Sequence, residues 1–337
     1  MQHLNVLIVG GGSIGERHLR TFLQTGEVAA SICEPRAEKL HELRQKYPVA
    51  KGYASFDDAP LDQFDAVVIC TPPNLHIPMA RKAAEADCHL LIEKPLSLNM
   101  DGVDDLIALV REKNLTAGVA FVLRHTPLYT RMKEKLDSGI TGRLRLASIK
   151  SGQQFSKFRP DYRNTYFAKK SMGGGSILDA VSHLLNYLEW CLGRESEVCC
   201  IYDHLSEMEI ETEDCAFLTL RFEKNVIAQI EQNLFQKDYQ TYIEFVGSEG
   251  TLRAAGELKQ GKAEPRIGFF QSDEEGWTLE PIPAYERDET FVAQARNFLN
   301  AIRGKEPIRT TLEEARRTLE VCLKAKESYE TKRILAV

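Results

Sequence analysis

The 337-residue sequence lacks any apolar run approaching the ~20 residues that a bilayer-spanning helix needs. Its start is polar and runs straight into a short apolar stretch, so we expect neither a signal peptide nor a twin-arginine leader. The sequence also has no excess of positive charge, because its formal net charge is −6. This charge argues against nucleic acid as a partner. We therefore expect a protein that binds neither membrane nor nucleic acid and works in the cytoplasm.

The sequence also lacks the cysteine spacings of metal sites. It has eight cysteines, none of them in a C-x-x-C pair, and most lie inside apolar runs. This distribution is typical of small buried side chains in a reducing compartment, and it predicts no zinc or other metal site. Repeats and low-complexity linkers are absent too, although the length suffices for two domains with full cores.

A glycine-rich turn stands close to the start of the chain. Gly10, Gly12 and Gly15 follow an apolar run and precede a helical pattern, in the spacing G-x-G-x-x-G. In a dinucleotide-binding turn the first glycine allows a tight bend, the second lets a pyrophosphate approach, and the third brings helix and strand together. Ser13 and Ile14 would then open a helix whose first N–H groups face the phosphates. The alternative is an ordinary strand–turn–helix without a ligand.

An acidic residue ends the next apolar run. Glu34 lies 19 residues after Gly15, close to the ~20 at which a carboxylate binds the adenosine ribose hydroxyls. Glu34 favours NAD over NADP, because a 2′-phosphate would face a like charge. Arg36 opposes this preference, since its guanidinium could stack on adenine or pair with a 2′-phosphate. We expect NAD as the cofactor, with NADP as the alternative.

The first part of the chain alternates strand and helix patterns. Strands are predicted near residues 28–33, 51–53, 66–70, 89–92 and 116–121, in addition to the run before Gly10. This alternation predicts an α/β domain with a doubly wound parallel sheet, a Rossmann domain, over residues 1–123. Ligands of such sheets bind at the carboxyl ends of the strands, where Gly10, Glu34, Thr71 and Glu93 stand.

A different pattern begins after residue 123. Strand-like runs near 198–202, 215–222, 226–233 and 242–246 alternate apolar and polar residues. They predict an antiparallel sheet with one apolar face and one polar face, the latter either solvated or a wet subunit interface. Residues 259–277 are polar and predict a hairpin or loop. The last helix begins with the capping-box residues Thr311 and Glu314.

Two further stretches carry side chains suited to proton transfer. Lys94 follows Glu93 at the ligand edge of the first sheet, where the alternative is a lysine that reaches solvent or pairs with a carboxylate. Asp179 and His183 lie four residues apart after three glycines, so they share one face of a helix. The alternative for such a pair is a surface contact or a polar pair whose hydrogen bonds are satisfied within the protein. To oxidise an alcohol, a histidine can take the hydroxyl proton while a lysine polarises the oxygen.

In these motifs the sequence resembles the family of glucose–fructose oxidoreductase, inositol dehydrogenase and MocA, called Gfo/Idh/MocA. The resemblance covers nearly the whole chain. Six motifs in the family's order carry it: 9–15, Thr71 to His76, Glu93 to Pro95, Leu123 to Pro127, 173–183 and 245–251. It implies an N-terminal Rossmann domain and, over residues 124–337, an α+β domain with a large, mostly antiparallel sheet. That second domain would bind substrate and form oligomers, and its last helix could pack back on the first domain.

The resemblance also implies roles for particular residues. Lys94, Asp179 and His183 match the catalytic trio, with His183 or Lys94 as general base. The cofactor would contact the glycine turn, Glu34, Arg36, Thr71, Pro72, Asn74 and His76, with Glu93 and Lys94 beside it. From the residues alone, the alternative for His76 is an ordinary residue at the start of a helix. The substrate would contact Lys94, Arg124, Tyr162, Arg163, Asp179 and His183.

Members of the family act on sugars, cyclitols and their derivatives, usually as dimers or tetramers joined through the open sheet face. Val181 and Asn186 depart from the family pattern, which has Gly and Asp there, and these departures leave the substrate open. The first hypothesis is an NAD(P)-dependent sugar or cyclitol dehydrogenase. The second is glycoside cleavage or epimerisation with a retained, recycled NAD, and the third is a non-catalytic dinucleotide or sugar sensor.

Overall fold

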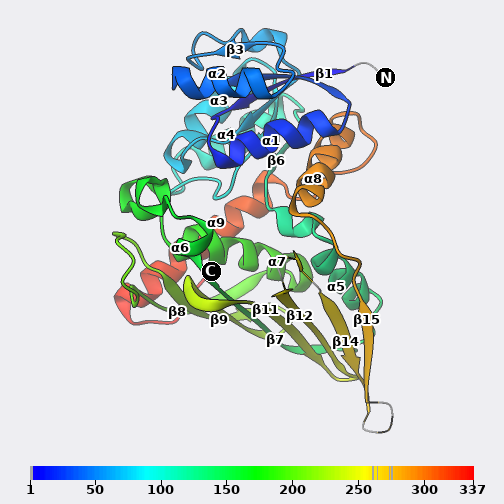
Figure 1. Ribbon diagram of the computed structural model, residues 1–337. Helices are drawn as coiled ribbons and strands as arrows, with labels where there is room; N and C mark the ends of the chain where they lie inside the picture. The colour runs from blue at the N-terminus through cyan, green and yellow to red at the C-terminus, as the bar shows by residue number, and fades with distance from the viewer. Residues whose placement is uncertain (1–2, 260–261, 264, 273, 275) are drawn as a thin grey trace. The chain divides into compact units, whose positions relative to one another are not determined.

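The computed structural model describes residues 3–259, 262–263, 265–272, 274 and 276–337. The chain divides into two compact units (Figure 1). One comprises Met1–His125 and Arg287–Arg317, and the other comprises Thr126–Glu286 and Thr318–Val337. No helix in the described part of the chain is both long and apolar enough to cross a membrane.

Among the described residues, the first unit contains a sheet of six parallel strands in the order β3-β2-β1-β4-β5-β6. The strands are β1 (Leu4–Val9), β2 (Val28–Cys33), β3 (Gly52–Tyr53), β4 (Ala66–Ile69), β5 (His89–Ile92) and β6 (Ala117–Val119). Side chains along β1 and β4 are buried, as expected for parallel strands covered on both faces. The predicted doubly wound parallel sheet is confirmed.

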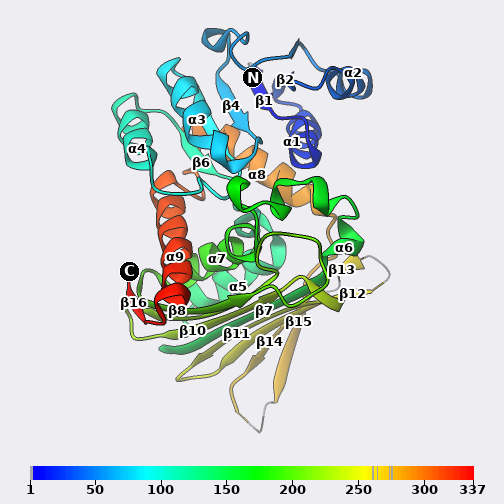
Figure 2. The same cartoon turned by 90° about the vertical axis from the view of Figure 1, so that its left-hand side faces the viewer.

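Helices cover both faces of this sheet. They are α1 (Ser13–Gln24), α2 (Ala37–Lys46), α3 (His76–Glu85), α4 (Val103–Glu112) and α8 (Arg287–Ile302). Figure 2 shows α1 and α2 on one side of the strands and α3 and α4 on the other. Helix α8 comes from far along the chain and packs on α1, with the rings of Phe22 and Phe298 6.3 Å apart and edge to face. Arg17 and Arg20 of α1 also bind Asp288 at the start of α8.

The second unit is built on a mixed sheet. Its described strands follow the order β15-β14-β12-β11-β7-β10-β9-β8-β16, with β13 paired to β12. They are β7 (Leu144–Gln154), β8 (Glu195–Asp203), β9 (Cys215–Phe222), β10 (Ile227–Asn233), β11 (Phe235–Gly247), β12 (Thr251–Lys259), β13 (Lys262–Ala263), β14 (Arg266–Phe270), β15 (Trp277–Pro281) and β16 (Leu335–Ala336). Only β7 and β10 pair in parallel among these neighbours, so the predicted, mostly antiparallel sheet is confirmed.

A hairpin or loop is predicted for residues 259–277. Residues 260, 261, 264, 273 and 275 lie outside the described residues. Within the remainder, β13 and β14 extend the sheet, and the pairing of β14 with β15 continues it beyond the predicted strands.

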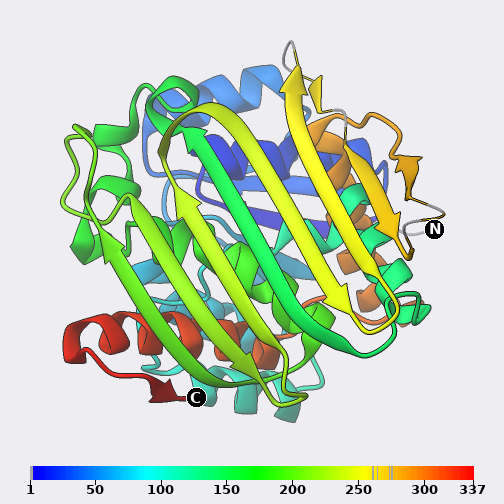
Figure 3. The same ribbon diagram turned by 90° about the horizontal axis from the view of Figure 1, so that it is seen from below.

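Helices of the second unit pack on one face of its sheet. They are α5 (Pro127–Asp137), the single turn α6 (Phe155–Phe158) and α7 (Ser182–Leu192), while α9 (Leu312–Thr331) contributes residues to both units. The ring of Tyr187 on α7 lies 4.8 Å from that of Tyr129 on α5 and 6.5 Å from that of Phe245 on β11. Figure 3 looks onto the opposite face, which no helix of the described chain covers.

The start of α9 confirms the predicted capping box. The backbone N–H of Glu314 donates to Thr311 Oγ1 over 3.2 Å, and the Thr311 N–H donates to Glu314 Oε2 over 2.9 Å. Two N–H groups that the helix leaves unpaired are thereby satisfied.

Acid is expected to destabilise the fold through His125. Burial, with the charges of Arg309 and Arg124, lowers the pKa of His125 from 6.5 to about 3. In the unfolded chain the pKa of His125 is ~6.5. Between pH ~6.5 and the folded-state pKa, the unfolded chain therefore binds a proton on His125 while the folded protein keeps the imidazole neutral. The free energy of unfolding should therefore be unaffected above pH ~6.5 and fall by about 2 kcal/mol on going from there to pH 5.

Urea unfolding of the wild type and of His125→Gln at neutral pH and at pH ~5 measures this effect. The variant should lose about 2 kcal/mol less than the wild type over the interval. Equal losses in the two proteins would show that His125 protonates freely in the folded state.

Candidate active site

The glycine turn between β1 and α1 has the shape of a phosphate-binding turn. Gly10 has a φ of +96°, and a Cβ there would lie 2.7 Å from the carbonyl oxygen of Cys70. A Cβ on Gly15 would lie 1.7 Å from the carbonyl oxygen of Gly10. At Gly12, by contrast, a Cβ would have no protein atom within 4 Å. The turn is thus closed on the protein side and open beside Gly12, where the start of α1 presents backbone N–H groups to an anion.

Glu34 follows β2, and its carboxylate is buried at the same end of the sheet. Its Oε2 accepts the N–H of Gly11 over 2.7 Å, and its Oε1 accepts the N–H and the Nε–H of Arg36 over 2.9 and 2.7 Å. Burial acts to raise the pKa of Glu34, but the bonds from Arg36 and Gly11 outweigh it and lower the pKa below its usual value. Glu34 is therefore a charged acceptor, and the Arg36 side chain, 65% exposed, lies beside it.

The turn after β4 carries Thr71, Pro72 and Asn74. Thr71 and Pro72 are half-buried and Asn74 is exposed, so all three side chains have some access to a ligand at the strand ends. His76, the first residue of α3, is fully buried. Its ring nitrogens contact backbone carbonyl oxygens rather than the surface, and its contact with a cofactor stays a prediction.

Lys94 follows β5 at this same edge. It is half-buried, and its backbone N–H donates to Glu93 Oε2 over 3.0 Å. Glu93 is 6% exposed, and its Oε1 lies 2.8 Å from Nε2 of His18 on α1. The parallel pairing of β2, β1, β4 and β5 brings Glu34, Gly10, Thr71 and Glu93 to one edge of the sheet, as their positions in the sequence predict.

The second unit carries Asp179 and His183 on one continuous helical stretch. Asp179 lies in a π-helical turn, Ile177–Val181, and His183 lies in the first turn of α7. Both side chains are half-buried. Single π-helical turns are rare and occur often at functional sites.

Tyr166 joins this pair. Its hydroxyl donates to Asp179 Oδ1. Sequence reasoning gave Tyr166 no role, because it lies in an irregular loop and no spacing relates it to Asp179. The signals in the sequence were its place in a stretch with several aromatic and basic residues and its presence among residues similar to family members found with bacterial surface-polysaccharide genes. The candidate site in the second unit thus includes the Tyr166 hydroxyl as well as Asp179 and His183.

The other residues predicted to bind substrate hold local structure. Tyr162 is 4% exposed, and its hydroxyl oxygen accepts the N–H of Glu209 over 3.3 Å. Arg163 is exposed and pairs with Glu209. Arg124 is 1% exposed, and its Nη1 donates to Glu314 Oε1 over 2.7 Å. Contact of these three residues with substrate stays a prediction.

The predicted catalytic residues are divided between the units. Lys94 belongs to the first unit, with the cofactor edge, and Asp179, His183 and Tyr166 belong to the second. Each unit by itself therefore presents part of the chemistry that hydride transfer from an alcohol requires. Among the described residues, no cluster of three or more His, Cys, Asp or Glu side chains is arranged to hold a metal ion.

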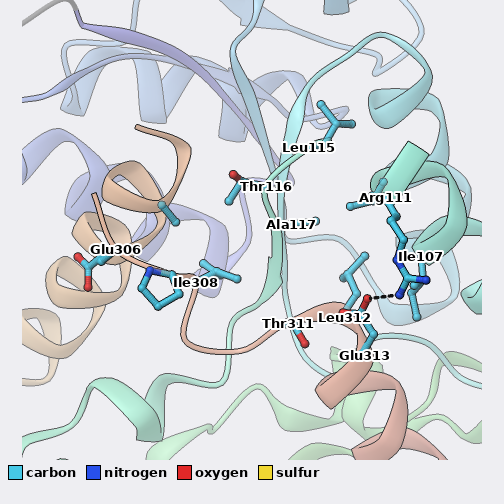
Figure 4. A pocket seen from close by; sticks show the side chains of 13 residues that line it. Ile107, Arg111, Leu115, Thr116, Ala117, Glu306, Ile308, Thr311, Leu312 and Glu313 are labelled. Atoms are coloured by element: carbon cyan, nitrogen blue, oxygen red, sulfur yellow. Dashed lines mark hydrogen bonds and ion pairs between the residues drawn. The ribbon is translucent and has the colours of Figure 1, made fainter. Parts of the chain in front are cut away.

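A cavity of about 340 Å³ lies in the first unit, away from the cofactor edge (Figure 4). It opens beside Thr116 and Ala117, where β6 begins, and its lining is largely apolar. The ion pair between Arg111 and Glu313, 3.1 Å long, is part of the lining. Because ligands of doubly wound sheets bind at the carboxyl ends of the strands, this cavity is not the dinucleotide site.

Comparison with models of known protein families shows to which family the chain belongs. Residues 4–121 match the model described as "Oxidoreductase family, NAD-binding Rossmann fold", and residues 129–253 match the "GFO/IDH/MocA C-terminal domain". The chain belongs to the Gfo/Idh/MocA family of oxidoreductases. It carries that family's NAD-binding domain and its C-terminal domain, and it is an NAD(P)-dependent oxidoreductase.

Characterised relatives in the Gfo/Idh/MocA family are distant. The myo-inositol 2-dehydrogenase of Thermotoga maritima is 25% identical, over 98% of this chain and 97% of its own length. The levoglucosan dehydrogenase of Pseudarthrobacter phenanthrenivorans is 24% identical, over 90% of each chain. A solved levoglucosan dehydrogenase in complex with NADH and levoglucosan shares the fold, with a TM-score of 0.87 and 21% identity over the full length of both chains. These relatives act on sugars and cyclitols, and they do not identify the substrate of this protein.

Proposed function

We propose that the protein is an NAD-dependent dehydrogenase that oxidises a secondary alcohol of a sugar, a cyclitol or a sugar derivative. The observation that supports this most is the position of Lys94, which follows β5 at the sheet edge that also bears the glycine turn and Glu34. A dinucleotide bound along that edge would bring its nicotinamide toward Lys94. The activities of the myo-inositol and levoglucosan dehydrogenases support the substrate class.

We assign each part of the hydride-transfer step to one group. NAD, when bound, supplies C4 of the nicotinamide as the acceptor of the hydride. Lys94 Nζ donates a hydrogen bond to the reacting hydroxyl oxygen and favours the negative charge that develops there. His183 takes the hydroxyl proton as the C–H electron pair leaves with the hydride, and a carbonyl group forms. Asp179, held by Tyr166, orients the imidazole.

A substrate screen tests the proposal. The purified protein is mixed with NAD or NADP and a panel of inositols, aldoses, anhydrosugars and amino sugars, and reduced cofactor is followed by its absorbance. At least one polyol or sugar should give steady formation of NADH. NAD that stays bound to the purified protein, with turnover of a sugar but no net NADH, would favour cofactor recycling instead. Failure of every sugar and cyclitol to react would favour the sensor hypothesis.

Arg36 is expected to lower the Kd for NADP(H). Its guanidinium lies against Glu34 and offsets the charge that would repel a 2′-phosphate. In Arg36→Ala that carboxylate is left without its cation, so the Kd for NADPH should rise at least ~10-fold, the value of a lost charged hydrogen bond. The Kd for NADH should change less than ~3-fold, because the ribose hydroxyls are neutral.

Titration of cofactor fluorescence measures both constants without a substrate. Arg81→Ala is the matched control, because Arg81 also pairs with a glutamate, Glu85, on the exposed part of α3. It should change neither constant. Equal weakening of NADH and NADPH by Arg36→Ala would instead indicate stacking on the adenine.

We further propose that the protein is a homodimer or homotetramer joined through the uncovered face of the second sheet (Figure 3). The face combines apolar and charged side chains, as wet subunit interfaces do. Phe217 and Leu146 are 47% and 50% exposed on it, and Ile201, paired with Phe217, is 64% exposed. Arg253 and Glu244 form an ion pair between the neighbouring strands β12 and β11. Exposed apolar side chains that adjoin one another, as Phe217 and Ile201 do, are typical of surfaces that bind another protein where they form a patch.

The oligomer proposal predicts an assembly that a charge on this face disrupts. Light scattering should give a multiple of the chain mass for the wild type and the mass of one chain for Phe217→Glu combined with Leu146→Glu. Leu75→Glu, at an exposed apolar residue of the first unit, is the control and should leave the mass of the assembly unchanged. A wild-type monomer at micromolar concentration would rule the proposal out.

A further inference from the structure

Two buried histidines contact the turn Glu93 to Pro95 from different helices of the first unit. His18 belongs to α1 and His76 to α3, and both are 0% exposed. Neither ring has access to solvent, and neither is among the residues proposed above to transfer a proton. Both contacts are with the residues that flank Lys94.

His18 contacts the residue before Lys94. Its Nε2 lies 2.8 Å from Glu93 Oε1, while Glu93 Oε2 accepts the backbone N–H of Lys94 over 3.0 Å. A carboxylate can only accept, so this contact needs the proton on Nε2. The other ring nitrogen, Nδ1, is buried and has no hydrogen-bond partner among the described residues. The polar contact of His18 is thus with Glu93, and the rest of the ring packs edge-on against Phe291 at 5.5 Å.

His76 contacts the residue after Lys94. Its Nδ1 lies 2.9 Å from the carbonyl oxygen of Pro95, and its Nε2 lies 2.9 Å from the carbonyl oxygen of Thr71. Both oxygens are acceptors, and burial lowers the pKa of His76, so the neutral ring donates to only one of them at a time. The ring lies between the turn after β4 and the turn after β5. Because Thr71 stands at the cofactor edge, the same side chain links a cofactor-facing turn to the backbone next to Lys94.

We propose that His18 and His76 are positioning residues that hold the backbone on both sides of Lys94, the first through the Glu93 carboxylate and the second through the Pro95 carbonyl. The inference rests on the proposed function of Lys94. It assigns the two histidines no proton transfer and no contact with substrate. It also connects α1, which starts at the phosphate-binding turn, to the position of the lysine.

Both histidine rings make their contacts in the buried interior. Removal of either ring takes a buried contact away from Glu93 or from the carbonyl oxygen of Pro95, which costs free energy and lets the turn move. A displacement of about 1 Å at a reacting group can lower a rate about 100-fold, and loss of an orienting partner typically costs about 10-fold to 100-fold. Such a loss should fall on kcat, because the phosphate-binding turn and Glu34 keep their own contacts.

Conservative variants separate positioning from general damage. Glutamine places its amide nitrogen near Nε2 of histidine, and asparagine places it near Nδ1. His18→Gln should therefore keep the bond to Glu93, whereas His18→Asn should lose it. For His76 the order reverses, since His76→Asn should keep the bond to Pro95 and His76→Gln should keep only that to Thr71. A purely structural role predicts no such reversal.

His89 supplies the matched control. It is half-buried at the start of β5, the strand that ends beside Glu93, and its Nδ1 accepts the N–H of Thr116 over 2.9 Å. His89→Gln and His89→Asn perturb the same strand at the opposite edge of the sheet. Neither variant should affect Lys94.

Two measurements test the proposal in the full-length protein. The first is kcat and KM on the substrate from the screen, together with the Kd for NADH. The second is NMR of lysines carrying ¹³C-methyl groups, with the Lys94 signal identified by its absence in Lys94→Arg. His18→Asn and His76→Gln should lower kcat about 10-fold to 100-fold, change the Kd less than ~3-fold and shift the Lys94 signal. His18→Gln, His76→Asn and both His89 variants should resemble the wild type.

An unmoved Lys94 signal and unchanged kcat in His18→Asn and His76→Gln would overturn the proposal. Equal losses in the Asn and Gln variants of each histidine would assign the rings to stability alone. The NMR signal needs no turnover, so it reports on positioning even where the dehydrogenase function itself fails the substrate screen.

Discussion

Lys94→Ala is expected to lower kcat for hydride transfer by about 1,000-fold, within the range that acid–base groups contribute. The variant loses the cation next to the reacting oxygen, so negative charge developing there has no partner. The Kd for NADH should change less than ~3-fold, because the phosphates and the ribose are bound by other groups. Stopped-flow or steady-state formation of NADH, with a parallel fluorescence titration, measures both quantities.

Lys82→Ala is the control for this prediction. Lys82 is another lysine of the first unit, on α3, and its ammonium pairs with Asp57 rather than with a group at the sheet edge. Its loss should leave kcat within ~2-fold of the wild type, as usual for exposed ion pairs. Turnover of the true substrate by Lys94→Ala at the wild-type rate would exclude the assigned role. Loss of activity together with loss of NADH binding would place Lys94 in cofactor binding instead.

Gly12→Val is expected to abolish dinucleotide binding while leaving the protein folded. Gly12 has a φ of −66° and a ψ of −176°, an extended conformation that valine adopts readily. A Cβ there meets no protein atom within 4 Å, so the side chain projects into the space proposed for the pyrophosphate. The Kd for NADH should rise at least ~100-fold, because a branched side chain displaces the phosphates from the N–H groups of α1.

The folded state of Gly12→Val should lose only about 1 kcal/mol, the typical difference between glycine and an aliphatic residue at a helix N-cap. Gly15→Ala is the contrasting variant. Its Cβ would lie 1.7 Å from the carbonyl oxygen of Gly10, so the helix and strand must separate and the protein should be strongly destabilised. Circular dichroism and thermal unfolding distinguish the two outcomes. Tight NADH binding by folded Gly12→Val would remove the glycine turn from the cofactor site.

The cofactor edge could be predicted because each of its residues is defined by local sequence. Gly10, Glu34, Thr71 and Glu93 each follow an apolar run, and the parallel pairing of those runs places their ends together. The same applies to the Thr311 capping box, which depends on a spacing of three residues within one helix turn. Predicting these features requires only the pattern of apolar residues and the spacing of nearby residues in the sequence.

For two predicted site residues the structure shows contacts that the sequence does not indicate, while their contacts with cofactor and substrate remain predictions. His76 is predicted to line the cofactor, and its ring is buried against the carbonyl oxygens of Thr71 and Pro95. Arg124 is predicted to bind substrate, and its guanidinium contacts Glu314, 190 residues later. A motif identifies the residue type and its approximate location, but the direction of the side chain depends on what packs around it.

The sequence by itself determined the two sheets, the dinucleotide turn, the acidic residue after β2 and the membership in the Gfo/Idh/MocA family. The sheets, the turn and the acidic residue follow from the alternation of apolar residues and from short fixed spacings, whereas the family follows from the resemblance of six motifs. Only the tertiary structure decided the packing of α8 on α1, the bond from Tyr166 to Asp179 and the contacts of His18 and His76 beside Lys94. Such contacts join elements whose separation along the chain carries no information about their separation in space.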